Sequence, residues 1–308
     1  MTRTMNAYKG LTIRNSKVFL KDKMVIFFSL LTQIIVLGLF LLFIKNSFAN
    51  GITSALGTLS DRVEKADIDA LLCAWMISGV IGTSVITSTM HALSVVVSDK
   101  QEKIDFDYNA SSVKGSVVVT SYFSAAVLCS LITSFILLTA GVIYLGITGS
   151  LLLGFKDILL LYGLVILGSV SAAVVLMSVI SFFKKNSTFT SFSIVISTLV
   201  GFIVGAYFPI SELDKTTQSI VNLIPGAQIT ALIRNILLNP YVDRIETSLG
   251  GLDQGQFREA ANELFGLRPY VFGTQIDTRF MLIFSLIVIA VFIILNIVLF
   301  NVSSKRKA

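Results

Sequence analysis

The chain has 308 residues, of which 54% are hydrophobic and 14% charged, and its mean hydropathy is +0.84. This composition leaves too little polar surface for a soluble globular protein of this length, so it excludes that class. The formal net charge of +6 fits basic loops beside anionic lipid headgroups, whose attraction stabilises each basic residue near the surface by about 1 kcal/mol. Nothing in this charge indicates binding of nucleic acid.

The N-terminal segment, residues 1–23, is basic and precedes the first apolar run. Within it, residues 5–21 predict an interfacial helix on the inner leaflet, because helical spacing separates an apolar side from a basic one. A basic flank that only fixes the topology is the alternative. The following run is too long for a signal-peptide core and lacks a small-residue cleavage site, so we expect an uncleaved anchor. The apolar side carries Met5, Tyr8, Leu11, Val18 and Phe19, and the basic side Arg3, Arg14, Lys17 and Lys21.

Six stretches of roughly twenty or more residues contain no Asp, Glu, Lys or Arg. A helix that rises 1.5 Å per residue needs about twenty apolar residues to cross about 30 Å of hydrocarbon, so each stretch is long enough to span a membrane. Because the runs are continuous and lack the alternation of a membrane barrel, we predict an all-α membrane protein with six transmembrane helices. The predicted spans are residues 24–44, 70–98, 116–145, 158–183, 186–208 and 280–302.

The basic residues predict the orientation. If the N-terminus is cytoplasmic, the inner segments carry 14 Lys and Arg within about fifty residues, against 10 in roughly twice that length outside. Both termini are therefore expected in the cytoplasm. The inner segments are residues 1–23, 99–115, 184–185 and the basic tail Lys305, Arg306 and Lys307.

The loop 209–279, expected outside, holds all four prolines of the chain. Its part from Ser219 to Leu238 is apolar, yet Pro225-Gly226 interrupts it and Arg234 would lie in lipid. A proline inside a helix costs about 3 kcal/mol and a central Arg about 2.5 kcal/mol or more, which disfavours a seventh span. We therefore predict a re-entrant hairpin of two half-helices that turns at Pro225-Gly226. The remainder, residues 241–276, predicts a polar cap with one helix, Gln256–Phe265.

Motifs for chemistry are absent from the sequence. No P-loop motif occurs, so the chain is not expected to bind ATP through one, and no metal-ligand cluster or catalytic group is present. His91 has no predicted carboxylate partner, so a helix contact is favoured over a proton relay. Without an acid inside the spans, ion-driven transport and a charge-ring channel are disfavoured. Cys73 and Cys129 both fall in spans and predict small core residues without a disulfide framework.

Small residues in the spans predict close packing of helices. Gly201 and Gly205 form a small-x-x-x-small pair in the fifth span, and such pairs let backbones approach in lipid. Packing within one subunit is favoured over a self-association face. Further close-approach positions are Gly79 and Gly82 in the second span and Gly168, Ser171 and Ala172 in the fourth.

Three motifs follow one another after the fifth span: Gly205-Ala206-Tyr207-Phe208-Pro209, then Asn222-Leu223-Ile224-Pro225, then Ala231-Leu232-Ile233-Arg234. Their order resembles the permease subunits of type-2 ATP-binding-cassette transporters, which include drug-resistance, antibiotic-peptide and polysaccharide exporters. That family has a glycine-aromatic-proline exit, a proline-centred hairpin of short outer helices and then an arginine. It often has Asn-Pro where this chain has Ile224-Pro225.

A second similarity lies after the second span, at Asp99-Lys100-Gln101-Glu102-Lys103-Ile104. The family places a charged cytoplasmic stretch there, which leads into a coupling helix that docks on the ATPase. The resemblance thus implies coupling contacts by Asp99, Lys100, Glu102 and Lys103. The usual Gly-Thr is missing, and Ser111-Ser112 stands where a proline is common.

The resemblance implies that residues 24–304 form a type-2 transmembrane domain in the cell membrane of a bacterium. It implies an exporter of amphipathic, drug-like, peptide or lipid-linked cargo, with cytoplasmic ATPase subunits and a second permease subunit as partners, in a homodimer or a heterodimer. ATP would be hydrolysed on the partner, so no cofactor is expected on this chain. An ion-coupled secondary carrier and a non-catalytic membrane component are the alternatives.

Overall fold

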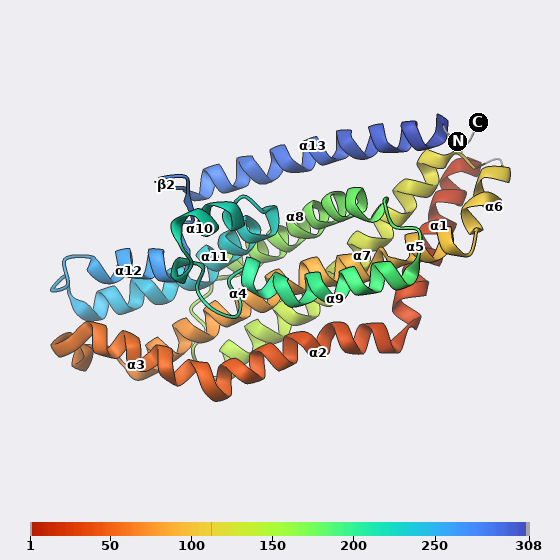
Figure 1. Ribbon diagram of the computed structural model, residues 1–308. Coiled ribbons are helices and arrows are strands. Elements are labelled where there is room, and N and C mark those ends of the chain that lie inside the picture. Colours follow the sequence, from red (N-terminus) through yellow and green to blue (C-terminus); the bar gives the residue numbers. More distant parts are fainter. Residues whose placement is uncertain (1, 112, 306–308) are drawn as a thin grey trace.

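The computed structural model describes residues 2–111 and 113–305 as an elongated bundle of helices (Figure 1). The long axis of the bundle follows the apolar helices, which run side by side. The helices that build the bundle are α1 (Thr2–Lys21), α2 (Lys23–Leu39), α4 (Lys65–Ala92), α5 (Ser94–Gln101), α7 (Gly115–Ile147), α8 (Phe155–Ile180), α9 (Asn186–Ile203), α11 (Pro225–Leu249) and α13 (Thr278–Lys305).

Shorter elements connect the bundle helices. A π-helical turn, η1, continues α2 into α3, and a two-stranded antiparallel hairpin pairs Tyr270 with Gln275. The short elements are η1 (Phe40–Ile44), α3 (Lys45–Leu56), η2 (Gly57–Arg62), α6 (Ile104–Ala110), η3 (Ile210–Glu212), α10 (Lys215–Asn222), α12 (Gln256–Leu264), β1 (Tyr270–Val271) and β2 (Thr274–Gln275).

Within the described residues, six helical segments are long and apolar enough to cross a membrane. Five of them match the predicted runs closely, whereas the first, Gln33–Arg62, overlaps the predicted span 24–44 only in residues 33–44. The count confirms the prediction of an all-α membrane protein with about six spans. The segments are Gln33–Arg62, Lys65–Gln101, Gly115–Ile147, Phe155–Ile180, Asn186–Ile203 and Thr278–Leu299.

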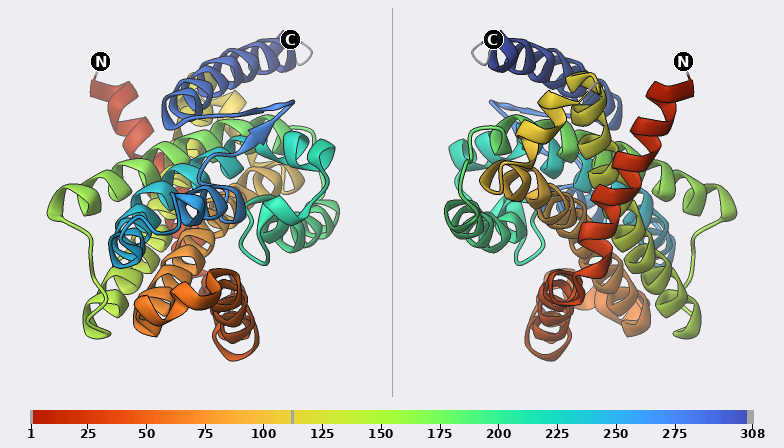
Figure 2. Two further views of the ribbon diagram at one scale, coloured as in Figure 1. Left: turned by 90° about the vertical axis from the view of Figure 1, so that its left-hand side faces the viewer. Right: turned by 90° about the vertical axis from the view of Figure 1, so that its right-hand side faces the viewer.

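Helix α4 is the centre of the bundle and packs against α2, α3, α7, α8, α9 and α11. Its largest side chain, Trp75, is 1% exposed and is surrounded by the rings of Phe40, Phe48 and Phe265, with centroids 5.5–5.7 Å away. Helices α2 and α13 lie on opposite edges of the bundle (Figure 2). Exposed Ile, Leu and Val side chains cover α13, as expected of a helix that faces lipid.

Glycines allow the close approaches that the sequence predicts around α4. A Cβ atom at Gly79 would lie 2.7 Å from Cβ of Ala206, and one at Gly82 would overlap the side chain of Thr230. Since real Cβ atoms do not approach so closely, only glycine permits α4 to pack this tightly against residue 206 and against α11.

The pair Gly201 and Gly205 has a different role from the helix packing that its spacing predicts. Helix α9 ends at Ile203 rather than near Phe208, and Gly205 adopts φ +66°, a left-handed conformation that glycine takes without strain. The backbone N–H of Ala206 donates to the carbonyl oxygen of Gly201 at 2.7 Å, and the ring of Tyr207 folds over the space where Gly201 lacks a side chain. The two glycines therefore close a turn within one chain.

The segment with the predicted hairpin is bent where the sequence expects it. Helices α10 and α11 meet at 91° across Leu223 and Ile224, and Pro225 begins α11. Proline is well suited to the first turn of a helix because its missing N–H has no intrahelical acceptor there. Helix α11 then continues through Pro240 to Leu249, beyond the predicted half-helix, and α12 matches the helix expected in the cap. Insertion of this pair into the membrane stays a prediction.

The described ends of the chain lie at the same end of the bundle. The first turns of α1 and the last turns of α13 are found there, together with α5 and α6, whereas α12 and the far end of α3 lie at the opposite end (Figure 1). We call these the α6 end and the α12 end. Of the basic tail, Arg306 and Lys307 lie outside the described residues.

Candidate coupling site

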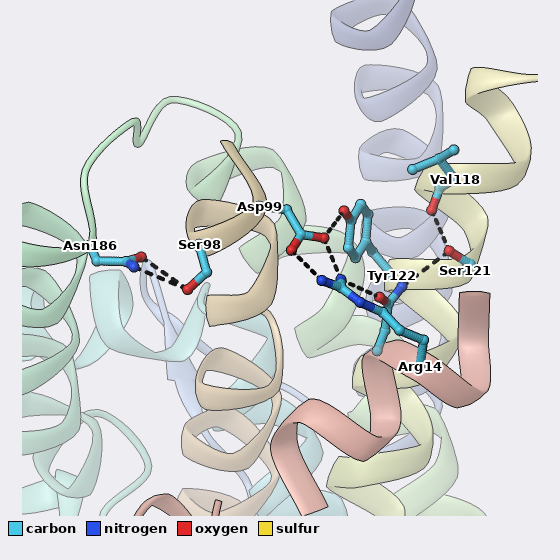
Figure 3. Close-up of polar contacts among 8 residues, drawn as sticks. Arg14, Ser98, Asp99, Val118, Ser121, Tyr122 and Asn186 are labelled. Carbon is cyan, nitrogen blue, oxygen red and sulfur yellow. Dashed lines mark hydrogen bonds and ion pairs between the residues drawn. The ribbon is translucent and has the colours of Figure 1, made fainter. Parts of the chain in front are cut away.

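The carboxylate of Asp99 is the centre of a polar cluster at the α6 end. Helix α5 follows α4 after a break at Leu93 and turns Asp99 toward α1 and α7, where only 2% of the residue is exposed. The guanidinium of Arg14 donates from Nη1 to Oδ2 at 2.5 Å and from Nη2 to Oδ1 at 2.7 Å. The hydroxyl of Tyr122 donates to Oδ2 as well (Figure 3). Three donors from two other helices thus hold this carboxylate.

Burial of an unpaired carboxylate is costly, so this geometry explains how Asp99 is accommodated. A planar guanidinium that binds both oxygens forms one of the stronger side-chain contacts in proteins. The hydrogen bond to Asp99 raises the pKa of Arg14 above its usual value. Arg14 keeps part of its surface in solvent, since 36% of its side chain is exposed against 3% for Asp99. The pair therefore links a partly hydrated cation to an enclosed anion.

The position of Arg14 differs from the helix with one apolar and one basic side that the sequence predicts. Helix α1 lies along α7 with a mixed polar face, in which Asn15 donates to Oγ of Ser121 at 3.2 Å. Arg14 points into the protein, while Met5 and Val18 are 52% and 45% exposed. The carboxylate of Asp99 explains the position of Arg14, and Ser121 of α7 explains that of Asn15, because both offer hydrogen bonds that a lipid surface does not. Contact between α1 and the membrane surface remains a prediction.

The other side of α5 is tied to the connection between α8 and α9. The side-chain amide of Asn186 donates to Oγ of Ser98 at 3.0 Å (Figure 3), and its backbone N–H donates to Oε1 of Gln101 at 2.7 Å. Lys100 donates from Nζ to the carbonyl oxygen of Ser181 at 2.8 Å. Helix α5 is consequently held on both sides, by α1 and α7 through Asp99 and by residues 181–186 through its neighbours.

Beyond α5 the chain turns outward at the α6 end. Glu102 and Lys103 are exposed, and Lys103 takes φ +62°, a left-handed conformation that turns the chain into α6. On α6 itself, Phe106 is 60% exposed, although large apolar side chains are commonly covered. This connection presents an acid and a base directly before α6 and an aromatic ring on it. Exposed aromatic rings are suited to a protein partner, because aromatic residues are enriched at interfaces.

The four residues that the resemblance selected for coupling thus divide into two sets. Glu102 and Lys103 lie on the surface, and Lys100 is partly buried against residue 181. Asp99 is enclosed between α1 and α7, so it is not a surface contact. Its role in the fold is internal, because its partners Arg14 and Tyr122 occupy both of its oxygens. Ser111 closes α6 by donating to the carbonyl oxygen of Tyr108, and Ser112 lies outside the described residues.

A second buried charge, Arg234, lies near the α12 end and is 2% exposed. Its Nε donates to Oγ of Ser78 at 3.1 Å, and Nη1 donates to the carbonyl oxygen of Phe265 at 2.9 Å. Its Nη2 donates to the carbonyl oxygens of Val204 and Gly205, at 2.9 and 3.1 Å. These carbonyls directly follow the last turns of α9 and α12. The last carbonyl groups of a helix have no donor within the helix and carry partial negative charge, so they stabilise a cation. The guanidinium thereby joins α4, α9, α11 and α12.

Sequence reasoning identified Asp99 and Arg234 but missed Arg14, Tyr122, Asn186 and Ser78. One signal was available: an acid that directly follows a long apolar run needs a cation nearby, and α1 is the basic segment expected on the same side. No sequence pattern indicates which of its basic residues is the partner. Within the described residues, no group of three or more potential ligands for a metal ion occurs.

Comparison with known proteins places this architecture in one family. A family model described as "ABC-2 family transporter protein" matches residues 68–302, well over half of the chain and five of its six candidate spans. Comparisons with curated proteins and with solved structures gave no match. On the extent of that family match, together with the six apolar helices, the chain belongs to the ABC-2 family of transporter proteins.

Proposed function

We propose that this chain is the permease subunit of an ATP-driven exporter, and that a separate ATPase subunit drives it from the α6 end. The observation that carries the proposal is the exposed connection of Glu102, Lys103 and Phe106, which continues directly from the central helix α4 through α5. A force applied to this connection acts on the helix that contacts most of the bundle.

The contacts of α5 supply the next step of the mechanism. Because Asp99 binds α1 and α7, and Asn186 binds α5 to the start of α9, a displacement of α5 is transmitted to three further helices. Packed side chains shift between discrete arrangements rather than deforming continuously, so such a push favours movement of whole helices. The N-terminal helix takes part through Arg14, in line with a position at the inner membrane surface.

The transport path is proposed to form between two permease subunits, identical or different. Apolar side chains remain exposed on α9 and α13, among them Ile194 and Ile294 at 63% and 62%. The six apolar runs carry no charged residue, and a path along them suits amphipathic, drug-like, peptide or lipid-linked cargo better than a compact ion. We further propose that the α6 end is cytoplasmic with both termini, and that α10 and α11 enter the membrane from the outer face as a re-entrant pair.

The coupling role is tested by charge reversal at the exposed connection. Glu102→Lys and Lys103→Glu, in transporter reconstituted with its ATPase subunit, are expected to reduce cargo-stimulated ATP hydrolysis several-fold and to weaken ATPase binding. Lys156→Glu on α8 and Glu212→Lys in η3 are matched controls, because both residues are exposed and lie away from α6. Full stimulation and full ATPase binding in the α6-end variants would contradict docking there.

The alternatives make different predictions. An ion-coupled secondary carrier would move cargo in liposomes under a proton or sodium gradient without any ATPase, and a non-catalytic membrane component would have no ATPase partner. A neighbouring gene for a P-loop ATPase, followed by co-purification of its product with this chain, supports the exporter. Transport by the purified chain alone under an ion gradient would overturn it.

A further inference from the structure

An open cavity of about 270 Å³ lies between α2, α4 and α7, far from the coupling site. Helix α4 contributes Met76, Ile77 and Val80 to its lining, and α7 contributes Leu137 and Ala140. Cavities of about 150 Å³ hold benzene, and drug-sized ligands occupy roughly 300 to 1,000 Å³, so this volume fits a stretch of one hydrocarbon chain.

The cavity is open toward lipid. Ala140, which lines it, is exposed, and Ile136 and Ile143 beside it on α7 are 56% and 55% exposed. On the opposite wall Leu41 lies in the π-helical turn η1, where Leu42 and Phe43 are 72% and 70% exposed. Single π-helical turns in long helices are frequent at functional sites because they redirect side chains. A membrane chain can therefore enter sideways between α2 and α7.

A charged pair lies just beyond the residues that line one end of the cavity. Lys45 lies one helical turn beyond Leu41, and Asp69 lies one turn before Cys73, another lining residue. Nζ of Lys45 is 3.0 Å from Oδ2 of Asp69. The two residues directly flank the apolar runs 24–44 and 70–98 of the sequence, so we expect the boundary between hydrocarbon and headgroups beside their charges.

One oxygen of this pair lacks a hydrogen-bond donor. Oδ1 of Asp69 is enclosed, and among the described residues no group donates to it. A buried acceptor without a donor is unfavourable, so a ligand N–H or O–H group that reaches this oxygen would be stabilised there. The side chains of Lys45 and Asp69 remain 20% and 32% exposed, which leaves room for such a ligand to approach both charges.

We propose that this cavity binds one acyl chain of a zwitterionic phospholipid with an ammonium headgroup, such as phosphatidylethanolamine. Its phosphate would lie at Lys45 and its ammonium group at the partly exposed carboxylate of Asp69, where rotation of that side chain would bring Oδ1 to the ligand. The two charges of the headgroup would thus meet the two charges of the protein. The acyl chain occupies the apolar cavity below. The lipid belongs to the leaflet at the α12 end, and the site is independent of cargo and of the ATPase.

Native mass spectrometry of the full chain, purified in mild detergent and loaded with defined lipids, tests this assignment. One phosphatidylethanolamine is expected to be retained at least several-fold better than phosphatidylcholine, whose headgroup has no N–H donor, and better than anionic phosphatidylglycerol. Ala140→Phe fills the mouth of the cavity and is expected to abolish the retention. Gly163→Phe is the matched control, since it adds the same ring on α8 where a new side chain meets open space.

The headgroup contacts are tested separately. Asp69→Asn and Lys45→Gln are expected to remove most of the preference among headgroups while a lipid can still bind through its acyl chain. Equal retention of the three lipids, preference for phosphatidylglycerol, or unchanged retention in Ala140→Phe would each overturn the proposal. So would displacement of the lipid by transported cargo at equal occupancy, which would assign the cavity to the transport path. None of these outcomes depends on ATP hydrolysis, so the test is separate from that of the coupling proposal.

Discussion

Two buried charges among the described residues, Asp99 at the α6 end and Arg234 near the α12 end, are stabilised in opposite ways. Asp99 is matched by a formal countercharge on α1, and that cation is partly hydrated. Arg234 is matched by neutral oxygens, three of them carbonyls at the ends of helices. The first arrangement can exchange protein contacts for water, whereas the second cannot without opening the bundle. We therefore call the Arg14–Asp99 pair at the α6 end an adjustable link, and the contacts of Arg234 near the α12 end a fixed link.

The largest effect is expected at Arg234. Arg234→Met would leave four hydrogen-bond acceptors without their donor in a closed space, at an expected cost of about 3–5 kcal/mol in the free energy of unfolding. Arg234→Lys keeps the charge but cannot reach oxygens on three other elements, so an intermediate loss of about 2 kcal/mol is expected. Thermal or denaturant unfolding of the purified protein measures both. Arg268→Met, at a nearby exposed arginine, serves as the control and should change stability by less than about 0.5 kcal/mol.

The next effect separates the members of the Asp99 link. Arg14→Gln leaves a carboxylate enclosed with Tyr122 alone, and we expect a loss of about 3 kcal/mol. Asp99→Asn leaves a cation that is 36% exposed and can turn toward water, so about 1–2 kcal/mol is expected. The double variant should resemble Asp99→Asn, because no unpaired buried charge remains. The free energies of unfolding of the three variants decide this. Equal losses in Arg14→Gln and Asp99→Asn would show that the exposure of Arg14 does not lower the cost of leaving it unpaired.

The sequence predicts those parts of the fold that depend on local composition. Six apolar runs locate the spans because length and absence of charge suffice for that inference. The break before Pro225 is also local, since proline and its neighbour restrict the backbone directly. The contact between Arg14 and Asp99 joins residues far apart in the chain, and it depends on how α1 lies on α7, which no periodicity encodes.

The glycine pair at the end of α9 shows a different limit of sequence reasoning. Gly201 and Gly205 have the spacing of a helix-packing motif, but a glycine shortly before a proline is also typical of a helix end. Both interpretations fit Gly205 and Pro209 equally well in the sequence. The left-handed φ of Gly205 decides between them.

A smaller effect is expected at Gly205, whose carbonyl oxygen accepts from Arg234. Gly205→Ala requires alanine in a left-handed conformation and places its Cβ about 2.9 Å from Cγ1 of Ile210. We expect a loss of about 1–2 kcal/mol. Gly163→Ala in the middle of α8 is the control, where added helix propensity predicts a gain of up to about 1 kcal/mol. Unfolding midpoints that move in the same direction in both variants would mean that backbone strain at Gly205 is unimportant.

The smallest effect is expected at Arg258, which provides an exposed counterpart of the Arg14 link. Arg258 binds Glu246 at 2.7 Å through Nε and also contacts Asp243, and its side chain is 36% exposed, as is that of Arg14. Its acids are 25% and 63% exposed, whereas Asp99 is enclosed. If burial of the acid decides the strength of such a pair, Arg258→Gln should cost less than about 1 kcal/mol and the loss should shrink in high salt. A loss as large as that of Arg14→Gln would instead show that the geometry of the guanidinium alone decides the strength of such a pair. The distinction between an adjustable and a fixed link would then have to rest on Arg234.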